Sequence, residues 1–313
     1  MRHLISTTSG PLLSRLGTEA GARVLRDAGF EAMDYGIQAY ANFAYSSRHE
    51  GDSLFEKPDA EVLAFFREQS AVLREVGIAV GQTHAPFPSN RLTETSISQE
   101  EHHFRLARLS VRITRELGCD YMVLHPAFNN HIPYDGRPDI AADHWEKNRV
   151  FYLSLLSEAR ECGVTVLLEN MWGRIFQTVP IFPSAISHAP EFCEWIDRLN
   201  EEAGEERFGA CLDTGHALLT GDDPAAMVRA LGGRLKALHM HDTKPDADLH
   251  TAPFDGTCDW VSLAAALREV GYAGTLNFET GSFSNRRPDA LLPACTEFLA
   301  ASARWLRTLV DGE

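Results

Sequence analysis

The sequence predicts an α/β protein whose fold is a single (β/α)8 TIM barrel, and three observations point to it. The chain of 313 residues alternates short apolar runs with helical patterns eight times. These runs are nearly continuous rather than alternating, as is typical of parallel strands covered on both faces. No GxGxxG turn follows the first run, where residues 11–17 read PLLSRLG. The missing motif argues against the alternative fold, an open doubly wound sheet that binds a dinucleotide.

Each predicted strand is followed along the chain by a predicted helix. We expect strands at residues 3–9, 32–37, 78–87, 121–126, 164–170, 208–217, 235–242 and 275–280. We expect helices at residues 18–30, 58–77, 97–118, 141–163, 189–204, 223–233, 259–274 and within 288–310. The helix at 58–77 shows the favoured end chemistry, because it starts at Pro58 and stops at Gly77. Residues 1–313 are expected to form one domain, since barrels of about 250 residues fold as one unit.

The composition narrows the classes of partner and compartment. The chain carries 44 acidic and 29 basic residues, a net charge of −15. This balance argues against nucleic acid as a partner and favours small substrates and metal cations. The six cysteines form no CxxC pair, the N-terminus has no apolar signal region, and no apolar run is long enough to cross a membrane. We therefore expect a cytoplasmic protein with reduced thiols and no membrane partner.

Polar residues stand at the carboxyl ends of the later predicted strands. They are His84, His125, Glu169, Asp213, His216, His239, His241, Asp242 and Glu279. Strand ends of this kind meet at one mouth of a barrel, where barrel enzymes have their active sites. Carboxylates and imidazoles gathered in a low-dielectric cup lose solvation, and a divalent cation offsets that cost. Mixed nitrogen and oxygen ligands suit Mn²⁺, Co²⁺, Zn²⁺, Fe²⁺ or Mg²⁺.

Several of these strand ends carry a family resemblance. The segments are LLEN with Glu169, LDTGHA with Asp213, LHMHD with His239, DLHTAPFDGTCDW at 248–260, and FET with Glu279. They resemble the xylose isomerase-like TIM barrel superfamily, and within it the sugar phosphate isomerase/epimerase group. The resemblance implies one divalent metal held by Glu169, Asp213, His239 and Glu279. It prefers His239 to His241, because the family's ligand histidine stands three positions before an acidic residue, here Asp242.

The same superfamily contains metal-dependent apurinic endonucleases of the endonuclease IV type. Their trinuclear zinc cluster uses further His and Asp ligands. The matching positions in this sequence are His84, His125, His216, Asp248 and His250. The resemblance thus implies Asp248 and His250 as candidate additional metal ligands, and leaves open more than one metal.

The first functional hypothesis is a metal-dependent isomerase or epimerase of a sugar, a sugar phosphate or a keto-polyol. A proton next to a carbonyl is weakly acidic, and its removal gives an enediolate that a metal can stabilise. Glu169 and Glu279 stand on strands five and eight, roughly opposite each other, and are the expected catalytic acid–base pair. The expected substrate-binding residues are His84, His125, His216, Trp172 and Lys244, with Phe87 and Trp172 as walls for a sugar.

Two other classes of enzyme would use the same metal-binding residues. An endonuclease IV-like nuclease with several zinc ions has a nearly complete ligand set, but the predicted mouth loops lack a basic stripe. A lyase or dehydratase also begins by deprotonation beside a carbonyl, so its residue roles barely change. Pro245 occupies the position where the superfamily's keto-epimerases carry an arginine, which weakens a ketose 3-epimerase assignment.

Long connections follow three of the strands, at residues 38–57, 127–139 and 171–188, and should lie over the mouth. The connection 171–188 is rich in apolar and aromatic residues, including Trp172 and Phe182. A bare patch of this kind is rare on a soluble monomer. We expect it to pack over the mouth or against a second subunit of a homo-oligomer.

Overall fold

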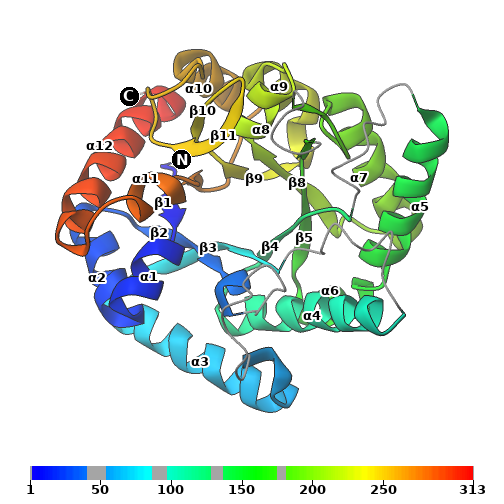
Figure 1. Ribbon diagram of the computed structural model, residues 1–313, viewed down its shortest axis with the longest axis horizontal. Helices are drawn as coiled ribbons and strands as arrows, with labels where there is room; N and C mark the ends of the chain where they lie inside the picture. The colour runs from blue at the N-terminus through cyan, green and yellow to red at the C-terminus, as the bar shows by residue number, and fades with distance from the viewer. Residues whose placement is uncertain (1, 41–53, 87–96, 128–136, 175–180, 313) are drawn as a thin grey trace.

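The structure, a computed structural model, describes residues 2–40, 54–86, 97–127, 137–174 and 181–312. Its centre is a parallel sheet in the order β12-β1-β2-β3-β4-β5-β8-β9. These strands are β1 (Ile5–Thr8), β2 (Ala32–Gly36), β3 (Ala79–His84), β4 (Tyr121–Leu124), β5 (Thr165–Glu169), β8 (Phe208–Asp213), β9 (Leu235–His239) and β12 (Leu276–Phe278). A parallel bridge between Met240 and Phe278 joins the two end strands, so the sheet curls into a nearly closed barrel (Figure 1). The predicted TIM barrel is confirmed.

Helices surround the barrel on its outside (Figure 1). They are α2 (Thr18–Ala28), α3 (Asp59–Val76), α4 (Ile97–Glu116), α5 (Pro138–Leu153), α6 (Leu156–Cys162), α7 (Ala189–Ala203), α9 (Pro224–Leu231), α10 (Trp260–Glu269) and α12 (Leu292–Asp311). Short helices follow the ends of strands β1, β8 and β12, namely α1 (Gly10–Leu16), α8 (Thr214–Leu219) and α11 (Gly281–Asn285). Single 3-10 turns lie at η1 (Ile37–Tyr40), η2 (Leu54–Glu56), η3 (Gly232–Arg234) and η4 (Asp289–Leu291).

Two small antiparallel ladders stand apart from the barrel sheet. The first pairs β6 (Trp172–Gly173) with β7 (Phe182–Pro183), and the second pairs β10 (Asp242–Lys244) with β11 (Ala247–Thr251). The helix ends follow the expected chemistry: α3 stops where Gly77 adopts a left-handed φ of 86°, which a residue without Cβ adopts at little cost.

The barrel interior explains why the site residues converge. Val123, Leu167, Cys211 and Ala237 form a buried apolar cluster separate from the larger core beneath the helices. Side chains two positions apart on a strand point to the same face. The residues two positions after these four are His125, Glu169, Asp213 and His239. The apolar layer therefore supports a layer of imidazoles and carboxylates directly above it.

Several sequence predictions need correction. The strand predicted at 208–217 ends at Asp213, and α8 begins at Thr214, so His216 lies on a helix. The helix predicted at 141–163 is interrupted after Leu153, where the backbone N–H of Leu155 bonds to Tyr152 three residues back instead of four. The predictions also omitted helices α1, α8 and α11 and both small ladders.

The remaining expectations have mixed outcomes. All six cysteines are unpaired thiols, as predicted. Among the described residues, no helix has both the length and the apolar character needed to cross a membrane. Parts of the predicted mouth connections, at 41–53, 128–136 and 175–180, lie outside the described residues, and so does Phe87. That residues 1–313 form a single domain stays a prediction.

Candidate metal centre

The four predicted metal ligands come together at the carboxyl end of the barrel. Glu169 ends β5, Asp213 ends β8, His239 ends β9, and Glu279 follows β12 directly. One ligand atom from each of these residues lies within 4.8 Å of the ligand atoms of the others. Glu169, Asp213 and His239 are fully buried, whereas the side chain of Glu279 keeps 19% of its exposure. The group is therefore closed below and open toward the mouth through Glu279.

His239 stands between three carboxylates. Its Nδ1 lies 3.0 Å from Glu169 Oε1 and 3.3 Å from Glu279 Oε2, while its Nε2 lies 3.0 Å from Asp34 Oδ2. Asp34 Oδ2 also accepts hydrogen bonds from the side-chain amides of Gln82 (3.0 Å) and Asn277 (3.3 Å). Asp34 thus fixes the ring so that Nδ1 faces the candidate ligand group.

Glu169 has a second pair of histidine neighbours on its other oxygen. Its Oε2 lies 3.1 Å from His125 Nε2 and 3.4 Å from His84 Nε2. Burial alone would raise the pKa of the Glu169 carboxyl, but His239 and His125 hold that pKa well below its ordinary value. Burial lowers the pKa of His125 to about 4. Glu169 is thus the point at which three imidazoles meet one carboxylate.

The DTGH segment is built around Asp213. Its carboxylate caps α8 by accepting from the backbone N–H of His216 (2.7 Å), and its Oδ1 lies 3.0 Å from His241 Nε2. The side-chain amide of Asn170 clamps the Asp213 backbone, with an N–H donated to its carbonyl (3.0 Å) and an oxygen accepting from its N–H (2.8 Å). Gly215 leaves room for the His241 ring, which an added Cβ would overlap.

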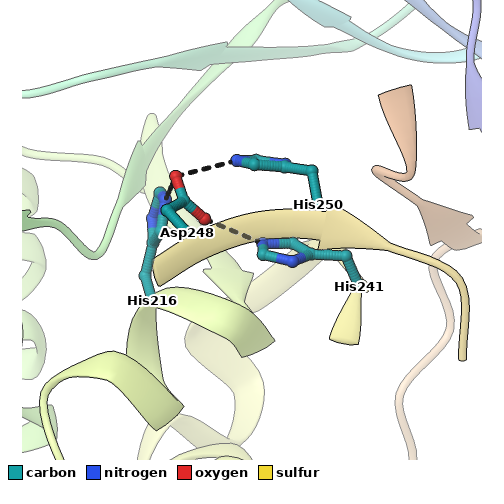
Figure 2. A group of neighbouring side chains, drawn as sticks. All are labelled: His216, His241, Asp248 and His250. Atoms are coloured by element: carbon teal, nitrogen blue, oxygen red, sulfur yellow. Dashed lines mark hydrogen bonds and ion pairs between the residues drawn. The ribbon is translucent and has the colours of Figure 1, made fainter. Parts of the chain in front are cut away.

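A second group lies beside the first and contains His216, His241, Asp248 and His250. Figure 2 shows Asp248 reaching between His216 and the rings of His241 and His250. Asp248 Oδ2 lies 3.0 Å from His250 Nε2 and 3.7 Å from His216 Nε2, and the stacked His241 and His250 rings have centroids 4.0 Å apart. The backbone of His250 has a φ of 43°, which residues other than glycine rarely adopt.

Asp242 explains the spacing of the residues in the segment DLHTAPFDGTCDW at 248–260. Its carboxylate accepts hydrogen bonds from the backbone N–H groups of Phe254 (3.0 Å) and Cys258 (3.1 Å) and from the Trp260 indole (3.1 Å). Gly256 is required because a Cβ there would overlap this carboxylate. Asp242 therefore folds the loop that follows β11, the strand that carries Asp248 and His250.

A cation fits these residues, because four histidine rings share one orientation. In His84, His216, His241 and His250, Nδ1 lies 2.8–3.2 Å from a backbone carbonyl oxygen, while Nε2 faces a carboxylate. A neutral imidazole that donates from Nδ1 presents only a lone pair at Nε2. That lone pair and a carboxylate repel each other unless a proton or a cation lies between them. Asp248 Oδ1 is also buried without a hydrogen-bond donor in place among the described residues.

Comparison with known proteins identifies the family. A family model described as xylose isomerase-like TIM barrel matches residues 22–309. The chain belongs to the xylose isomerase-like TIM barrel family. Among curated relatives, it is 26% identical to an inosose dehydratase from Lacticaseibacillus casei over 163 residues, 47% of this chain and 50% of that protein. The chain thus spans about half the length of this relative.

The chain is also similar to a curated nuclease relative and to a solved epimerase-like structure. The chain is 23% identical over 212 residues to a probable endonuclease 4 from Mycobacterium bovis, covering 66% of this chain and 75% of that protein. A solved D-tagatose 3-epimerase-like protein superposes with a TM-score of 0.71 at 16% identity, over 100% of this chain and 99% of that one. A likeness at such identity shows the fold alone.

The predicted substrate-binding residues lie at different distances from the candidate ligands. His84 and His125 contact Glu169. His216, a member of the second group, lies 3.7 Å from Glu169 Oε1 and 3.7 Å from Asp248 Oδ2, so it links the two groups. Trp172, half-buried in β6, has its ring centroid 6.3 Å from that of His216. Lys244 is exposed at the turn between β10 and β11 and is not brought into the described cluster.

Two residues with structural importance, Asp34 and Asn170, escaped the sequence predictions, and His241 was predicted at a strand end but not as a candidate ligand. Asp34 lies in β2 within the run AMDYG, and an acidic residue inside a fully buried strand was the available signal. Asn170 directly follows Glu169 in LLEN. His241, passed over in favour of His239, contacts Asp213 and joins the second group, so the HMH pair supplies both groups.

Proposed function

We propose that the chain is a divalent-metal-dependent isomerase or epimerase of a small carbohydrate or keto-polyol. The observation that carries this proposal is the placement of two carboxylates around one imidazole. Glu169 Oε1 and Glu279 Oε2 lie 3.0 and 3.3 Å from the same His239 Nδ1, although Glu169 ends β5 and Glu279 directly follows β12, strands that are not neighbours in the barrel. Two carboxylates placed in this way support proton transfer in which one removes a proton from a substrate carbon and the other returns it on the other side.

The chemistry requires a group that stabilises negative charge. Loss of a proton beside a carbonyl gives an enediolate, whose charge is costly in a buried site. When bound by Glu169, Asp213, His239 and Glu279, a divalent cation would supply the positive charge that stabilises it. The environments of the two carboxylates differ: burial raises the pKa of Glu279, whereas the neighbouring histidines lower that of Glu169. With Glu169 and Glu279 on different sides of a bound substrate, one carboxylate would accept the proton while the other returns one.

The remaining polar residues would bind and orient the substrate. His216 lies between the two ligand groups and would hold a substrate oxygen, while Trp172 would cover an apolar face of a sugar ring. His84 and His125 would orient Glu169. Lys244 would act only on a substrate long enough to reach the turn of the β10–β11 hairpin. A free ketose, an inositol-like ketone and a sugar phosphate all stay within this proposal.

Two alternative functions have specific support. A dehydratase would use the same deprotonation, and the inosose dehydratase relative favours including keto-inositols among the substrates tested. A multi-metal nuclease is favoured by the second group of His216, His241, Asp248 and His250 and by the endonuclease relative. The net charge of −15 opposes it, because binding to DNA needs cations along the phosphate path.

Exchange of a substrate C–H proton with deuterated water tests the proposal. A panel of ketoses, inositol ketones and their phosphates is incubated with metal-loaded protein and followed by proton NMR. Glu169→Gln and Glu279→Gln should each slow exchange about 10²–10⁴-fold. Metal content is measured in parallel, because both residues are also candidate ligands. Glu201→Gln, on the exposed face of α7, is the matched control and should exchange at the wild-type rate.

The outcomes separate the three classes. Exchange with recovery of an epimer or isomer supports the proposal, and exchange followed by loss of water identifies a dehydratase. Absence of exchange with every panel member, together with metal-dependent nicking of abasic DNA, refutes the isomerase proposal in favour of the nuclease.

A further inference from the structure

Helix α12 is apolar on two faces, although one face would suffice to dock it on the barrel. Its inner face is buried in the core through residues that include Leu292, Leu299, Leu306 and Val310. Its outer face exposes large side chains as well: Phe298 keeps 47% and Trp305 41% of their surface. A helix that is apolar all round is normally buried all round. Helix α12 lies on the outside of the barrel (Figure 1), so these exposed apolar side chains face away from the core.

A regular stripe of exposed apolar residues runs along α12 and starts at Leu291, the last residue of η4. The other members are Ala294, Phe298, Ala301 and Trp305, and successive members are separated by three, four, three and four residues. This is the heptad spacing with which one helix packs along another. Large and small side chains alternate along it. Two aromatic rings from neighbouring segments widen it, since Phe254 lies 5.3 Å from Trp305 and Phe283 lies 5.8 Å from Phe298, measured between ring centroids.

We propose that this α12 stripe packs antiparallel against the same stripe of a second copy of the chain. An isologous contact requires a surface that is complementary to itself. When two such stripes run antiparallel, Phe298 of one copy lies over Ala301 of the other, and Trp305 lies over Ala294. Each large side chain then fills the space above a small one, as well-packed helices require. The reverse contacts follow from the two-fold axis.

The charged residues beside the stripe also favour a second copy of the chain as its partner. Glu297 and Arg304 are exposed on one side of it, seven residues apart. In the antiparallel register, Glu297 of each copy lies beside Arg304 of the other, which gives two reciprocal ion pairs. Arg304 donates one N–H to the Ala28 carbonyl (3.0 Å), and its guanidinium has further donors for such a pair. A lipid surface fits less well, because interfacial helices carry many cations and this chain has a net charge of −15.

Sedimentation velocity on the metal-loaded full chain, across a range of concentrations, tests the proposal. The wild type should form a dimer. Ala301→Glu should raise the dimer dissociation constant about 30-fold or more, because it buries a charge at the centre of the contact. Glu297→Arg should weaken the dimer by repelling the second copy's Arg304, and the double variant Glu297→Arg/Arg304→Glu should restore it. Val150→Glu, on exposed α5, is the matched control and should leave the dimer intact.

Circular dichroism and thermal melting of each variant confirm that it remains folded. A wild type that stays monomeric at every concentration overturns the proposal. So does a dimer that tolerates both Ala301→Glu and Glu297→Arg, which would place the interface on another face. A monomer that instead binds acidic lipid vesicles through Trp305, seen as a shift in its fluorescence, would identify a membrane surface as the occupant. Failure of the charge swap to rescue association refutes the antiparallel register.

Discussion

Asp34 Oδ2 lies 3.0 Å from His239 Nε2, on the side of the ring opposite to Glu169 and Glu279. The two residues come from β2 and β9, which are separated around the barrel by β12 and β1. A carboxylate that accepts a hydrogen bond from one imidazole N–H fixes the tautomer and directs the other nitrogen at a cation. Asp34 is thus a second partner of the candidate ligand His239. It comes from β2, a strand that contributes no residue to either ligand group.

Asp34→Asn should weaken metal binding without displacing the ring. Asparagine keeps an oxygen for His239 but removes the negative charge, and loss of such a partner typically costs about 10–100-fold in metal affinity. Competition with a chromophoric chelator measures the affinity. Asp143→Asn, on the exposed face of α5, is the control and should bind metal as the wild type does. Equal affinities in Asp34→Asn and wild type would show that His239 needs no such partner.

Asp242 should be critical for the stability of the loop after β11. Asp242→Asn replaces one acceptor oxygen by an N–H₂ group that faces other donors, so buried N–H groups lose their partner. We expect the free energy of unfolding to fall by about 2–4 kcal/mol, at about 1–3 kcal/mol for each unsatisfied group. Urea denaturation measures this change. Asp246→Asn, exposed at the hairpin turn, should change it by less than about 0.5 kcal/mol. Similar values for both variants would contradict the assignment.

The barrel was predictable from its strand pattern, and the candidate ligand residues from that pattern together with the family resemblance. Continuous apolar runs located the strands, and the polar residues that close them were brought to one mouth by parallel topology. Glu169 and His239 illustrate this, because each stands two positions after an interior apolar residue, Leu167 or Ala237. Alternation brings these side chains to one mouth, and the family resemblance singled out Glu169, Asp213, His239 and Glu279, whose ligand atoms lie within 4.8 Å of one another in the structure.

What the sequence did not reveal depends on contacts between distant strands. Asp34 has no motif, and its role arises only when folding brings its side chain to His239 of β9. His216 was assigned to a strand because LDTGHA continues an apolar run, whereas Asp213 both ends β8 and caps α8. The role of His241 also depends on folding, since the turn after β9 and the small size of Gly215 direct its ring toward Asp213.

Removing divalent metal should destabilise the protein. The Nε2 atoms of His84, His216, His241 and His250 face carboxylates, and a cation bound among these groups would add a stabilising interaction that only the folded state has. A ligand at 100 times its Kd adds about 2.7 kcal/mol to the free energy of unfolding. Chelation should therefore lower Tm, and Mn²⁺, Co²⁺, Zn²⁺, Fe²⁺ or Mg²⁺ should restore it, with elemental analysis of the purified protein reporting which metal is held. A Tm that responds neither to chelator nor to any of these ions would refute the metal centre.

Gly215→Ala tests whether the His241 ring occupies the position that the structure gives it. A Cβ on Gly215 would overlap that ring, which is confined by Asp213 on one side and the stacked His250 on the other. The ring must therefore move away from Asp213, and overpacking of this kind costs about 1–3 kcal/mol. Gly233→Ala is the matched control, because a Cβ there meets no atom within 4 Å. We expect Gly215→Ala alone to lower both the free energy of unfolding, measured by urea denaturation, and the affinity for metal, measured by chelator competition. If Gly215→Ala matches Gly233→Ala in both measurements, His241 lies elsewhere and the second ligand group does not exist as described.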